Sequence, residues 1–210
     1  MDLSNKLLVA LPNILDPRFA KAVIYICSHN ENGCLGLTIN APSQNLTVGD
    51  TLSQLNLPEF DIDALIDGDG NNSKLANSTI EMPPHLFQIP VLNGGPVEHN
   101  RGFVLHSKDY ELAGQTLKIS NSISMTSTAD ILSDISRGRG PKKICFAIGY
   151  VGWRADQLEK EISENAWLVI DADDDIVFNH EFDKKYEMTM QLIGIPPEMV
   201  SSISSASGRA

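Results

Sequence analysis

The chain has 210 residues, of which 42% are hydrophobic and 20% are charged. This composition is close to the globular average and excludes an intrinsically disordered chain. Asp and Glu outnumber Lys and Arg by 27 to 16, which gives a formal net charge of -11. A surface of that charge repels polyanions, so we expect no tight, direct binding to duplex DNA.

The first part of the chain has the composition of β-strands. Two apolar, β-branched runs, AVIYICS at 22–28 and LGLTIN at 35–40, follow a shorter apolar run at 7–11. Asn32 and Gly33 lie between the two longer runs and are residue types that supply positive φ angles in tight turns. The pattern therefore predicts an antiparallel hairpin.

A short helix and a long polar insertion are predicted next. The helix is expected to begin at Thr47 or Asp50. Its apolar residues are Leu52, Leu55 and Leu57. Residues 59–90 contain DGDGNNSKLANS and several prolines, which is typical of a loop inserted between elements. DGDGNN at 67–72 resembles the start of a calcium loop, but it lacks the glycine at the sixth position and the Glu at the twelfth, so a solvated loop is favoured.

The second half returns to strand-like runs and then adds helices. The strand-like runs are VLNGG, GFVLHS, TLKIS and SISMT. Ser127 with Asp130 three residues later is expected to cap a helix that ends at Gly138. The apolar face of that helix is Ile131, Leu132 and Ile135. KICFAIGYV at 143–151 is almost continuously apolar, as in a strand that is buried on both faces.

The C-terminal third is predicted to alternate helices and short strands. Residues 154–165 have the pattern of an amphipathic surface helix. Residues 167–171 and 176–178 are predicted to be strands around the acidic turn DADDD, and a last helix is expected from 183 to 194. The apolar face of that last helix is Tyr186, Met190 and Ile193.

Helices interrupt the strands without strict alternation, and the sequence contains no internal repeat, which favours an α+β fold over a doubly wound one. We expect a single domain over 1–203 and a flexible, serine-rich tail at 204–210. Trp153 and Trp167 bracket the amphipathic helix and are expected to be buried, with hydrogen-bond acceptors for their indole N–H groups.

The cysteines and the N-terminus indicate a reducing, cytoplasmic location. Cys27, Cys34 and Cys145 have no CxxC spacing and are interpreted as reduced thiols, of which Cys34 is expected to meet solvent. The N-terminus lacks the charged and apolar regions of a signal peptide, and no run approaches the ~20 apolar residues of a membrane span. The acidic run at 173–175 is interpreted as a charged turn, and no cofactor or metal is expected.

SRGRGPKK at 136–143 forms the basic cluster of the chain. Its cations are Arg137, Arg139, Lys142 and Lys143. Cations complement the dipole at the C-terminus of a helix, which explains the cluster without a ligand. The alternative is a site for a small anion or for an acidic partner surface.

GGPVEHNRGFVLHS at 94–107 is the most distinctive stretch. Paired glycines permit a close backbone approach, an arginine can bind an anion, and a histidine can act as a base near neutral pH. A structural turn ahead of a strand is the competing interpretation. The candidate ligand or partner residues are Gly94, Gly95, Arg101, His106, Thr126 and Ser127.

Several of these motifs carry a family resemblance. LLVALP with Asp16, Pro17 and Phe19, then YICSHNENGCLGLTIN, GGPV, RGFVLH, MTSTADIL and AIGYVGWRADQLEKEISENAWL together resemble the YqgE/AlgH family of bacterial proteins. The resemblance covers most of the chain and is most specific in GGPV and in QLExEIxxNxWL. It implies a compact domain with a branched sheet flanked by helices, in a cytoplasmic protein often labelled a transcriptional regulator. It implies no catalytic residues.

Three functional hypotheses remain open. The favoured one is a non-enzymatic binding or regulatory protein that contacts another protein or a small ligand through the GGPV region. The second is an enzyme with a site assembled near GGPV and RGFVLH from Arg101, His106, Thr126 and Ser127. The third is a direct DNA-binding regulator, although the sequence shows no helix-turn-helix pair. No nucleophile elbow, phosphate loop, HExxH or paired CxxC motif supports an enzyme.

Overall fold

A computed structural model describes residues 2–12, 14–54 and 84–196. The predicted helix residues Leu55 and Leu57, most of the predicted insertion and the predicted tail lie outside this part. The end of the predicted insertion is described, and it forms a 3-10 helix and the start of a strand rather than a loop. No helix within the described residues is long and apolar enough to span a membrane.

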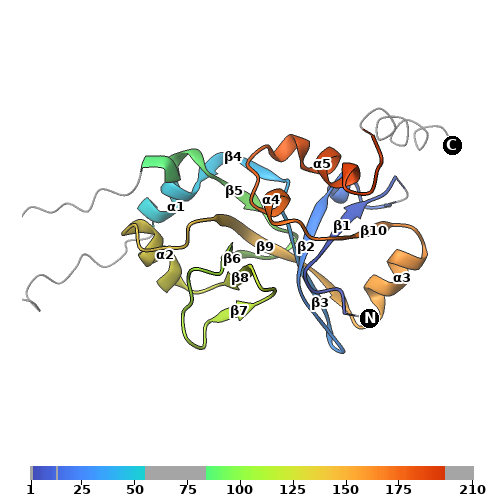
Figure 1. Cartoon of the computed structure of the whole chain (residues 1–210), viewed down its shortest axis with the longest axis horizontal. Coiled ribbons are helices and arrows are strands. Elements are labelled where there is room, and N and C mark those ends of the chain that lie inside the picture. Colours follow the sequence, from blue (N-terminus) through green and yellow to red (C-terminus); the bar gives the residue numbers. More distant parts are fainter. Residues whose placement is uncertain (1, 13, 55–83, 197–210) are drawn as a thin grey trace, which may run out of the picture.

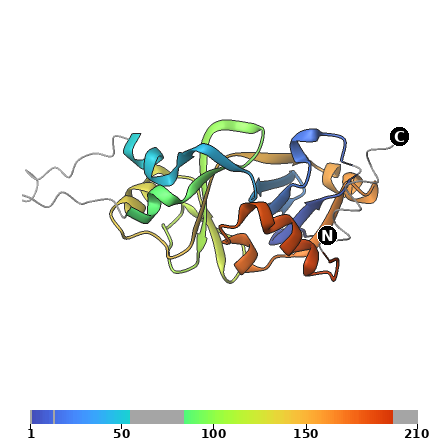
Figure 2. The same cartoon turned by 90° about the horizontal axis from the view of Figure 1, so that it is seen from above.

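The described residues form a curled, mainly antiparallel sheet with helices at both ends (Figures 1 and 2). This mixed arrangement confirms the predicted α+β class. The strands are β1 (Lys6–Ala10), β2 (Val23–Asn30), β3 (Gly33–Thr38), β4 (Pro42–Thr47), β5 (Pro90–Asn93), β6 (Val97–Ser107), β7 (Thr116–Lys118), β8 (Ile123–Thr126), β9 (Ile144–Arg154) and β10 (Trp167–Asp171). The helices are α1 (Val48–Gln54), α2 (Ala129–Ser136), α3 (Gln157–Ser163), α4 (Asp174–Val177) and α5 (Lys185–Gln191), with 3-10 turns η1 (Pro17–Phe19), η3 (Pro84–Gln88) and η4 (Phe182–Lys184).

The main path through the sheet runs β10-β1-β2-β3-β9-β6-β8-β7, and β5 joins it as a branch at β9. Ala147 and Ile148 of β9 pair with β5 and also with β6, so these two strands must lie on opposite edges of β9. Further along, β9 pairs with β3 from Val151 to Arg154. The Thr38 N–H at the end of β3 donates to the Gly94 carbonyl at the end of β5 over 2.9 Å. The sheet therefore branches where β3 and β5 meet along β9.

The chain crosses from one edge of β9 to the other between β5 and β6, and glycines make this crossing possible. A Cβ on Gly94 would lie 2.2 Å from the Gly149 carbonyl oxygen, and a Cβ on Gly95 would lie 2.2 Å from the Tyr150 carbonyl carbon. Gly149 itself has a φ of +73°. A side chain at either crossing residue would separate the two backbones, because non-bonded heavy atoms pack at about 3.5–4.0 Å. The glycines of the GGP sequence thus allow the crossing that places β5 and β6 on opposite edges of β9.

The predicted hairpin is confirmed, with one correction to its turn. β2 and β3 pair antiparallel and close between Asn30 and Gly33. Gly33 has a φ of +137°, but Asn32 does not have the predicted positive φ. Instead, the Asn32 N–H donates to the Asn30 side chain over 2.8 Å, which is the local turn chemistry that Asn favours.

The starts of α1 and α2 differ in their capping, since a side chain caps α1 and none caps α2. Thr47 begins α1 as one of the two predicted starts, because its hydroxyl accepts from the Asp50 N–H while the Asp50 carboxylate accepts from the Thr47 N–H. The predicted cap of α2 is wrong. Thr128 occupies the N-cap position of that helix, and Ser127 lies one residue outside it. The Thr–Ser–Thr run offers adjacent hydroxyls, so the sequence alone could not select the cap.

The C-terminal end of α2 is closed by its predicted glycine. Gly138 has a φ of +69°, and its N–H donates to the Ile135 carbonyl over 3.0 Å. The Arg139 N–H donates to the Asp134 carbonyl over 2.8 Å. This pair of bonds is a Schellman motif, which satisfies carbonyl groups at the helix end.

The predicted strand at 176–178 is a helix in the structure. The Asp173 carboxylate accepts from the N–H groups of Asp175 and Ile176, which begins α4. The acidic run is therefore a helix cap rather than a turn between strands. In the last helix, Tyr186 and Met190 are buried as predicted, but Ile193 is 41% exposed, because α5 ends before it.

The core lies on both faces of the sheet. Alternate residues of β2 face opposite sides, and both sets are buried. One face packs against α4 and α5, and the other packs against α3 and the two tryptophans. A third cluster lies beneath α1 and α2 at the far end. Cys27, Cys34 and Cys145 are free thiols, and Cys34 is buried at 8% exposure rather than facing solvent as predicted.

Candidate functional site

The structure divides the sequence-predicted site residues among three environments. Gly94 and Gly95 pack backbone to backbone against β9, as described above. Arg101 lies on the surface, where it pairs with Glu98 over 3.1 Å and donates to the Ser127 hydroxyl over 3.3 Å. Its guanidinium also lies 5.2 Å from the centre of the Phe103 ring. Arg101 and Ser127 are therefore brought together, on an exposed surface.

His106 and Thr126 are also brought together, but in the interior, where both have 0% exposure. The His106 Nδ1–H donates to the Ser107 carbonyl over 3.0 Å, so Nε2 must accept from the Thr126 hydroxyl over 3.0 Å. Thr126 in turn accepts from the Thr116 hydroxyl over 2.8 Å, and Thr116 accepts from the Leu112 N–H. Both ring nitrogens of His106 are thus used within the fold.

Burial lowers the pKa of His106 below its ordinary value, which keeps the imidazole neutral. A neutral histidine with no solvent access and two internal hydrogen bonds is not placed to act on a substrate. The arrangement instead ties β6 to β8 and β7. The four residues of the enzyme hypothesis thus form two separate pairs, and neither pair is a reactive site. His106 and Thr126 lie in the interior, whereas Arg101 and Ser127 lie on the surface.

A groove at the other end of the sheet collects side chains from distant parts of the chain. We call it the tryptophan groove, and its volume is about 600 Å³. Its lining residues are Ile14, Leu15, Asp16, Arg18, Phe19, Pro96, Val97, Val151, Gly152, Trp153, Gln157, Glu161, Glu164, Ala166 and Trp167. Three separate segments thus meet in it: the chain around η1, the start of β6, and the continuous run from the end of β9 through α3 to β10.

One carboxylate organises the wall of this groove. Glu161 Oε2 accepts from the Trp153 indole N–H over 2.9 Å and from the Trp167 indole N–H over 2.8 Å. Glu161 Oε1 accepts from the Gln157 side chain over 2.9 Å. The indole rings are edge to face with centroids 6.0 Å apart, and Phe19 stacks edge to face on Trp167 at 5.8 Å. The tryptophans are buried at 6% and 3% exposure with acceptors for both N–H groups, as predicted.

The rim of the tryptophan groove exposes apolar side chains. Leu15 is 97% exposed and Val97 is 36% exposed. Apolar surface beside a groove is typical of an interaction site. The charged groups of the lining are three acids and one arginine, and the arginine is paired with Asp16 over 2.6 Å.

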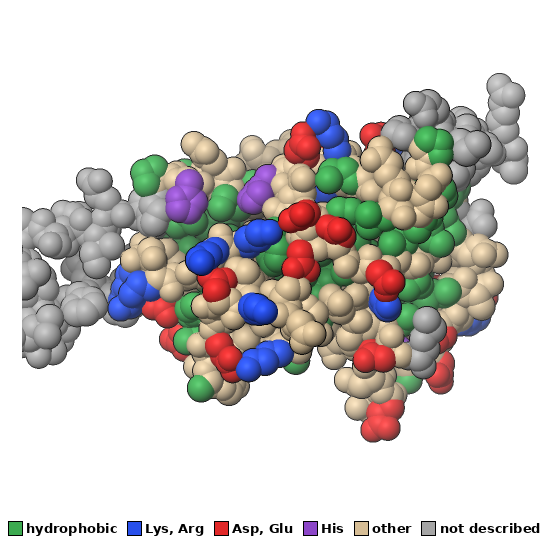
Figure 3. Space-filling model, viewed as in Figure 1, with side chains coloured by type: hydrophobic (Ala, Val, Ile, Leu, Met, Phe, Trp, Pro, Cys, Tyr) green, Lys and Arg blue, Asp and Glu red, His purple; other side chains and the backbone are tan. Residues whose placement is uncertain are grey.

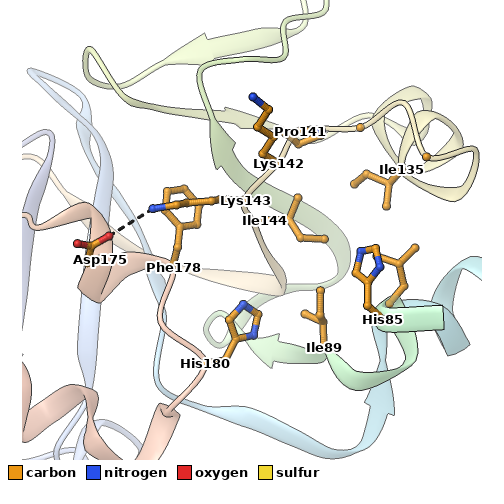
Figure 4. Close-up of a pocket in the computed structure, with 13 residues that line it drawn as sticks. His85, Ile89, Ile135, Pro141, Lys142, Lys143, Ile144, Asp175, Phe178 and His180 are labelled. Atoms are coloured by element: carbon orange, nitrogen blue, oxygen red, sulfur yellow. Dashed lines mark hydrogen bonds and ion pairs between the residues drawn. The ribbon is translucent and has the colours of Figure 1, made fainter. Parts of the chain in front are cut away.

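A second cavity, the basic cleft, lies where the start of β9 meets η3 and the segment after α4, and its volume is about 630 Å³. In Figure 4 the Lys142 side chain points away from Ile144, Lys143 extends beside Phe178 toward Asp175, and His85 and His180 lie on the other side of Ile144. Figure 3 shows histidine side chains and Lys or Arg side chains on this face of the molecule, with Asp and Glu side chains among them. Part of the basic cluster found in the sequence therefore lines a cavity.

The comparisons with known proteins identify the family of the chain. The AlgH-like family model matches residues 7–198, and the chain belongs to this family. A UPF0301 protein from Bradyrhizobium sp. is 42% identical over 208 residues, which cover 99% of this chain and 88% of that protein. A UPF0301 protein from Ruegeria pomeroyi is 43% identical and covers 96% of this chain and 97% of its own length.

Solved structures agree with this assignment. The solution structure of the AlgH protein from Pseudomonas aeruginosa matches with a TM-score of 0.73 and 33% identity, over 96% of this chain and 94% of that one. A crystal structure of a protein from Corynebacterium diphtheriae matches with a TM-score of 0.66 and 17% identity, over 98% and 91% of the two chains, which supports the fold alone. The resemblance inferred from the motifs is thus confirmed.

Sequence reasoning missed the tryptophan groove, although it named several of its parts. GGPV, Asp16, Phe19 and QLExEIxxNxWL were all noted, but they lie up to about 150 residues apart along the chain. The sequence signal that could have indicated the groove is the set of specified polar and aromatic positions in QLExEIxxNxWL. Gln157, Glu161 and Trp167 occupy specified positions of that motif, and all three line the groove.

The buried His106 predicts a pH dependence of stability. Because its folded-state pKa lies below the ordinary 6.5, the unfolded chain binds the proton first as the pH falls. The His106 contribution is complete above about pH 6.5 and is lost as the pH falls from there toward the folded-state pKa. His106→Gln should lower the free energy of unfolding at pH 8 by about 1–3 kcal/mol.

Urea denaturation at pH 8 and pH 5.5 measures this prediction. The variant should lose less stability than the wild type between the two pH values. The variant will still lose some stability at pH 5.5, because it keeps His180, whose pKa is also lowered by burial. An identical pH dependence in the two proteins would contradict the buried, neutral assignment.

The shared carboxylate predicts a coupled effect on both tryptophans. Glu161→Ala leaves two buried indole N–H groups without their acceptor, so the free energy of unfolding should fall by about 2–6 kcal/mol, at roughly 1–3 kcal/mol for each group. Tryptophan emission should also change, since the chain has only these 2 tryptophans. Glu164→Ala is the matched control on the same helix, because Glu164 is exposed and its pair with Lys160 is long at 3.9 Å. Equal stability of the two variants would show that Glu161 does not hold the indoles.

Proposed function

We propose that this protein is a cytoplasmic, non-catalytic binding protein that holds a segment of a partner protein in the tryptophan groove. The single observation that carries the proposal is the convergence of the family motifs. Asp16 and Phe19, then Pro96 and Val97 of GGPV, and finally the QLExEIxxNxWL segment all contribute lining residues to one groove. A structural role for each motif alone would not require them to meet at one surface.

The chemistry of the tryptophan groove favours a particular kind of partner segment. The two indole rings are almost completely buried, so the apolar surface that a partner can reach is that of the exposed Leu15 and Val97 and the half-buried Phe19. Apolar surface of this kind binds bulky apolar side chains. The charged lining residues are Asp16, Glu161, Glu164 and Arg18, which together give a negative balance. The segment should therefore present an apolar residue flanked by Lys or Arg, a composition that the net charge of -11 also favours.

The groove gives little support to catalysis. Both oxygens of Glu161 already accept hydrogen bonds from the fold, and Asp16 is held by Arg18. Glu164 is the remaining carboxylate of the described lining, and no histidine, cysteine, serine or threonine lines the groove with it. A general base needs a free carboxylate or imidazole within reach of a substrate. Binding is therefore the better interpretation than an enzyme, and the acidic surface disfavours the DNA-binding alternative.

Site-specific photo-crosslinking in living cells tests this proposal. A photoreactive residue at Leu15, which is 97% exposed, should give discrete crosslinks to a protein. The same residue at Leu117, which is 43% exposed on β7 and outside the groove lining, is the matched control and should not give them. The crosslinked peptide of the partner should contain a bulky apolar residue beside Lys or Arg.

A second substitution makes the crosslinking result specific. Val97→Lys places a positive charge in the groove at a partly exposed position, where it repels the Lys or Arg flanks of the segment, so it should abolish the Leu15 crosslinks while the protein stays folded. Identical products at Leu15 and Leu117, or crosslinks that survive Val97→Lys, would refute binding in the tryptophan groove. Tryptophan emission and the denaturation midpoint verify that the variant keeps its fold.

A further inference from the structure

The basic cleft is a positively charged hollow on a strongly acidic protein. Its charged lining residues are Lys142, Lys143 and Asp175, and His85 and His180 add two imidazoles. The Lys142 ammonium makes no ion pair within 4.0 Å among the residues that the structure describes. In a chain whose net charge is -11, such a grouping concentrates anions locally.

The acid in the basic cleft does not neutralise it. Asp175 pairs with Lys143 over 3.3 Å, and their side chains are 92% and 51% exposed. An ion pair this exposed contributes little stability, so an incoming anion can replace the Asp175 carboxylate on Lys143. The C-terminus of α2 adds a partial negative charge of about half a unit near the cleft, which two lysines outweigh.

A buried lysine adds positive charge behind the cleft wall. Lys185 has 0% exposure and donates to the Val177 carbonyl over 2.8 Å. It lines a narrow crevice whose walls include Phe178 and His180, which also line the basic cleft. Burial lowers the pKa of Lys185 to about 8, so an anion placed nearby would stabilise its charged form.

The rest of the cleft is apolar and aromatic. Ile89, Ile144 and Phe178 line it together with the two imidazole rings (Figure 4). A ligand that uses both surfaces needs a multiply charged group for the lysines and a flat apolar body for the floor. A phosphate monoester carries about -1.5 to -2 charges and three acceptor oxygens, which suits donors that approach from several directions. The volume of about 630 Å³ is that of a small-molecule site.

We propose that the basic cleft is a second binding site, for a small organic phosphate that carries a planar ring. Lys142 and Lys143 bind the phosphate, and the ring lies against Ile89 and the exposed imidazole of His180, since Ile144 and Phe178 are each only 8% exposed. The site is separate from the tryptophan groove, since the two share no lining residue. A negative result for phosphate binding would therefore leave the proposed function of the tryptophan groove unaffected, and the reverse is also true.

Calorimetric titration of the full chain with named probes tests the proposal. Phenyl phosphate and adenosine 5′-monophosphate should bind saturably in the millimolar range or tighter. Phenol and adenosine, which lack the phosphate, should bind at least ~10-fold more weakly, and inorganic phosphate, which lacks the ring, should also bind more weakly. Affinity for the phosphates should fall as salt concentration rises.

Matched variants locate the binding. Lys142→Gln and Lys143→Gln should each weaken phosphate binding about 10-fold, because each removes a charge-assisted hydrogen bond. Lys118→Gln, an exposed lysine on β7 outside the cleft lining, should leave the affinity unchanged. The side chains of Lys118 and Lys143 are 66% and 51% exposed, and Lys142 is also exposed. We therefore expect all three variants to fold.

Three results would overturn the proposal. They are the absence of saturable binding by both ring phosphates at millimolar concentration, equal affinity for inorganic phosphate, and equal weakening by Lys118→Gln and Lys142→Gln. Leu15→Asp in the tryptophan groove should not alter phosphate affinity, which distinguishes failure of this site from failure of the proposed function.

Discussion

The close approach of two backbones at Gly94, Gly95 and Gly149 is the constraint on which the rest of the structure depends. The chain leaves β5 on one edge of β9 and enters β6 on the other edge, so it must cross β9 in direct contact with it. Only residues without a Cβ allow this distance. The crossing frees one edge of β9 for β3, which joins the N-terminal strands to the rest of the sheet. The branched sheet is the consequence.

The same crossing places residues of the tryptophan groove next to the end of β9. Pro96 and Val97 follow the two glycines directly, and the last residues of β9 lead through Trp153 into α3. The Glu161 carboxylate on α3 accepts hydrogen bonds from both indole N–H groups, and these bonds hold α3 against β9 and β10. An apparently architectural turn and an apparently amphipathic helix thus form one surface. The glycines of GGPV thus make the crossing, and the two residues that follow them line the groove.

Much of the fold was predictable from local pattern, and the errors have physical causes. The hairpin, the buried β9 and the burial of both tryptophans followed from residue type and periodicity. The strand expected at Ile176 to Phe178 failed because Asp173 caps a helix turn there, and capping chemistry outweighed β-propensity. His106 looked like a site residue because its partners, Thr126 and Thr116, come from other strands. The tryptophan groove and the basic cleft could not be predicted, since each combines segments that only the tertiary fold brings together.

The GGPV glycines hold the sheet and the tryptophan groove in one arrangement, and a pair of glycine variants measures how far both depend on the crossing. Gly94→Ala places a Cβ 2.2 Å from the Gly149 carbonyl oxygen, whereas Gly114, with a φ of +72°, has open space around it. We expect Gly94→Ala to lower the free energy of unfolding by at least about 2 kcal/mol and to alter tryptophan emission in the native state. Gly114→Ala should cost only about 1 kcal/mol, from backbone strain, with unchanged emission. Equal stability and identical emission of the two variants would show that the close approach at Gly94 does not hold the sheet and the groove together.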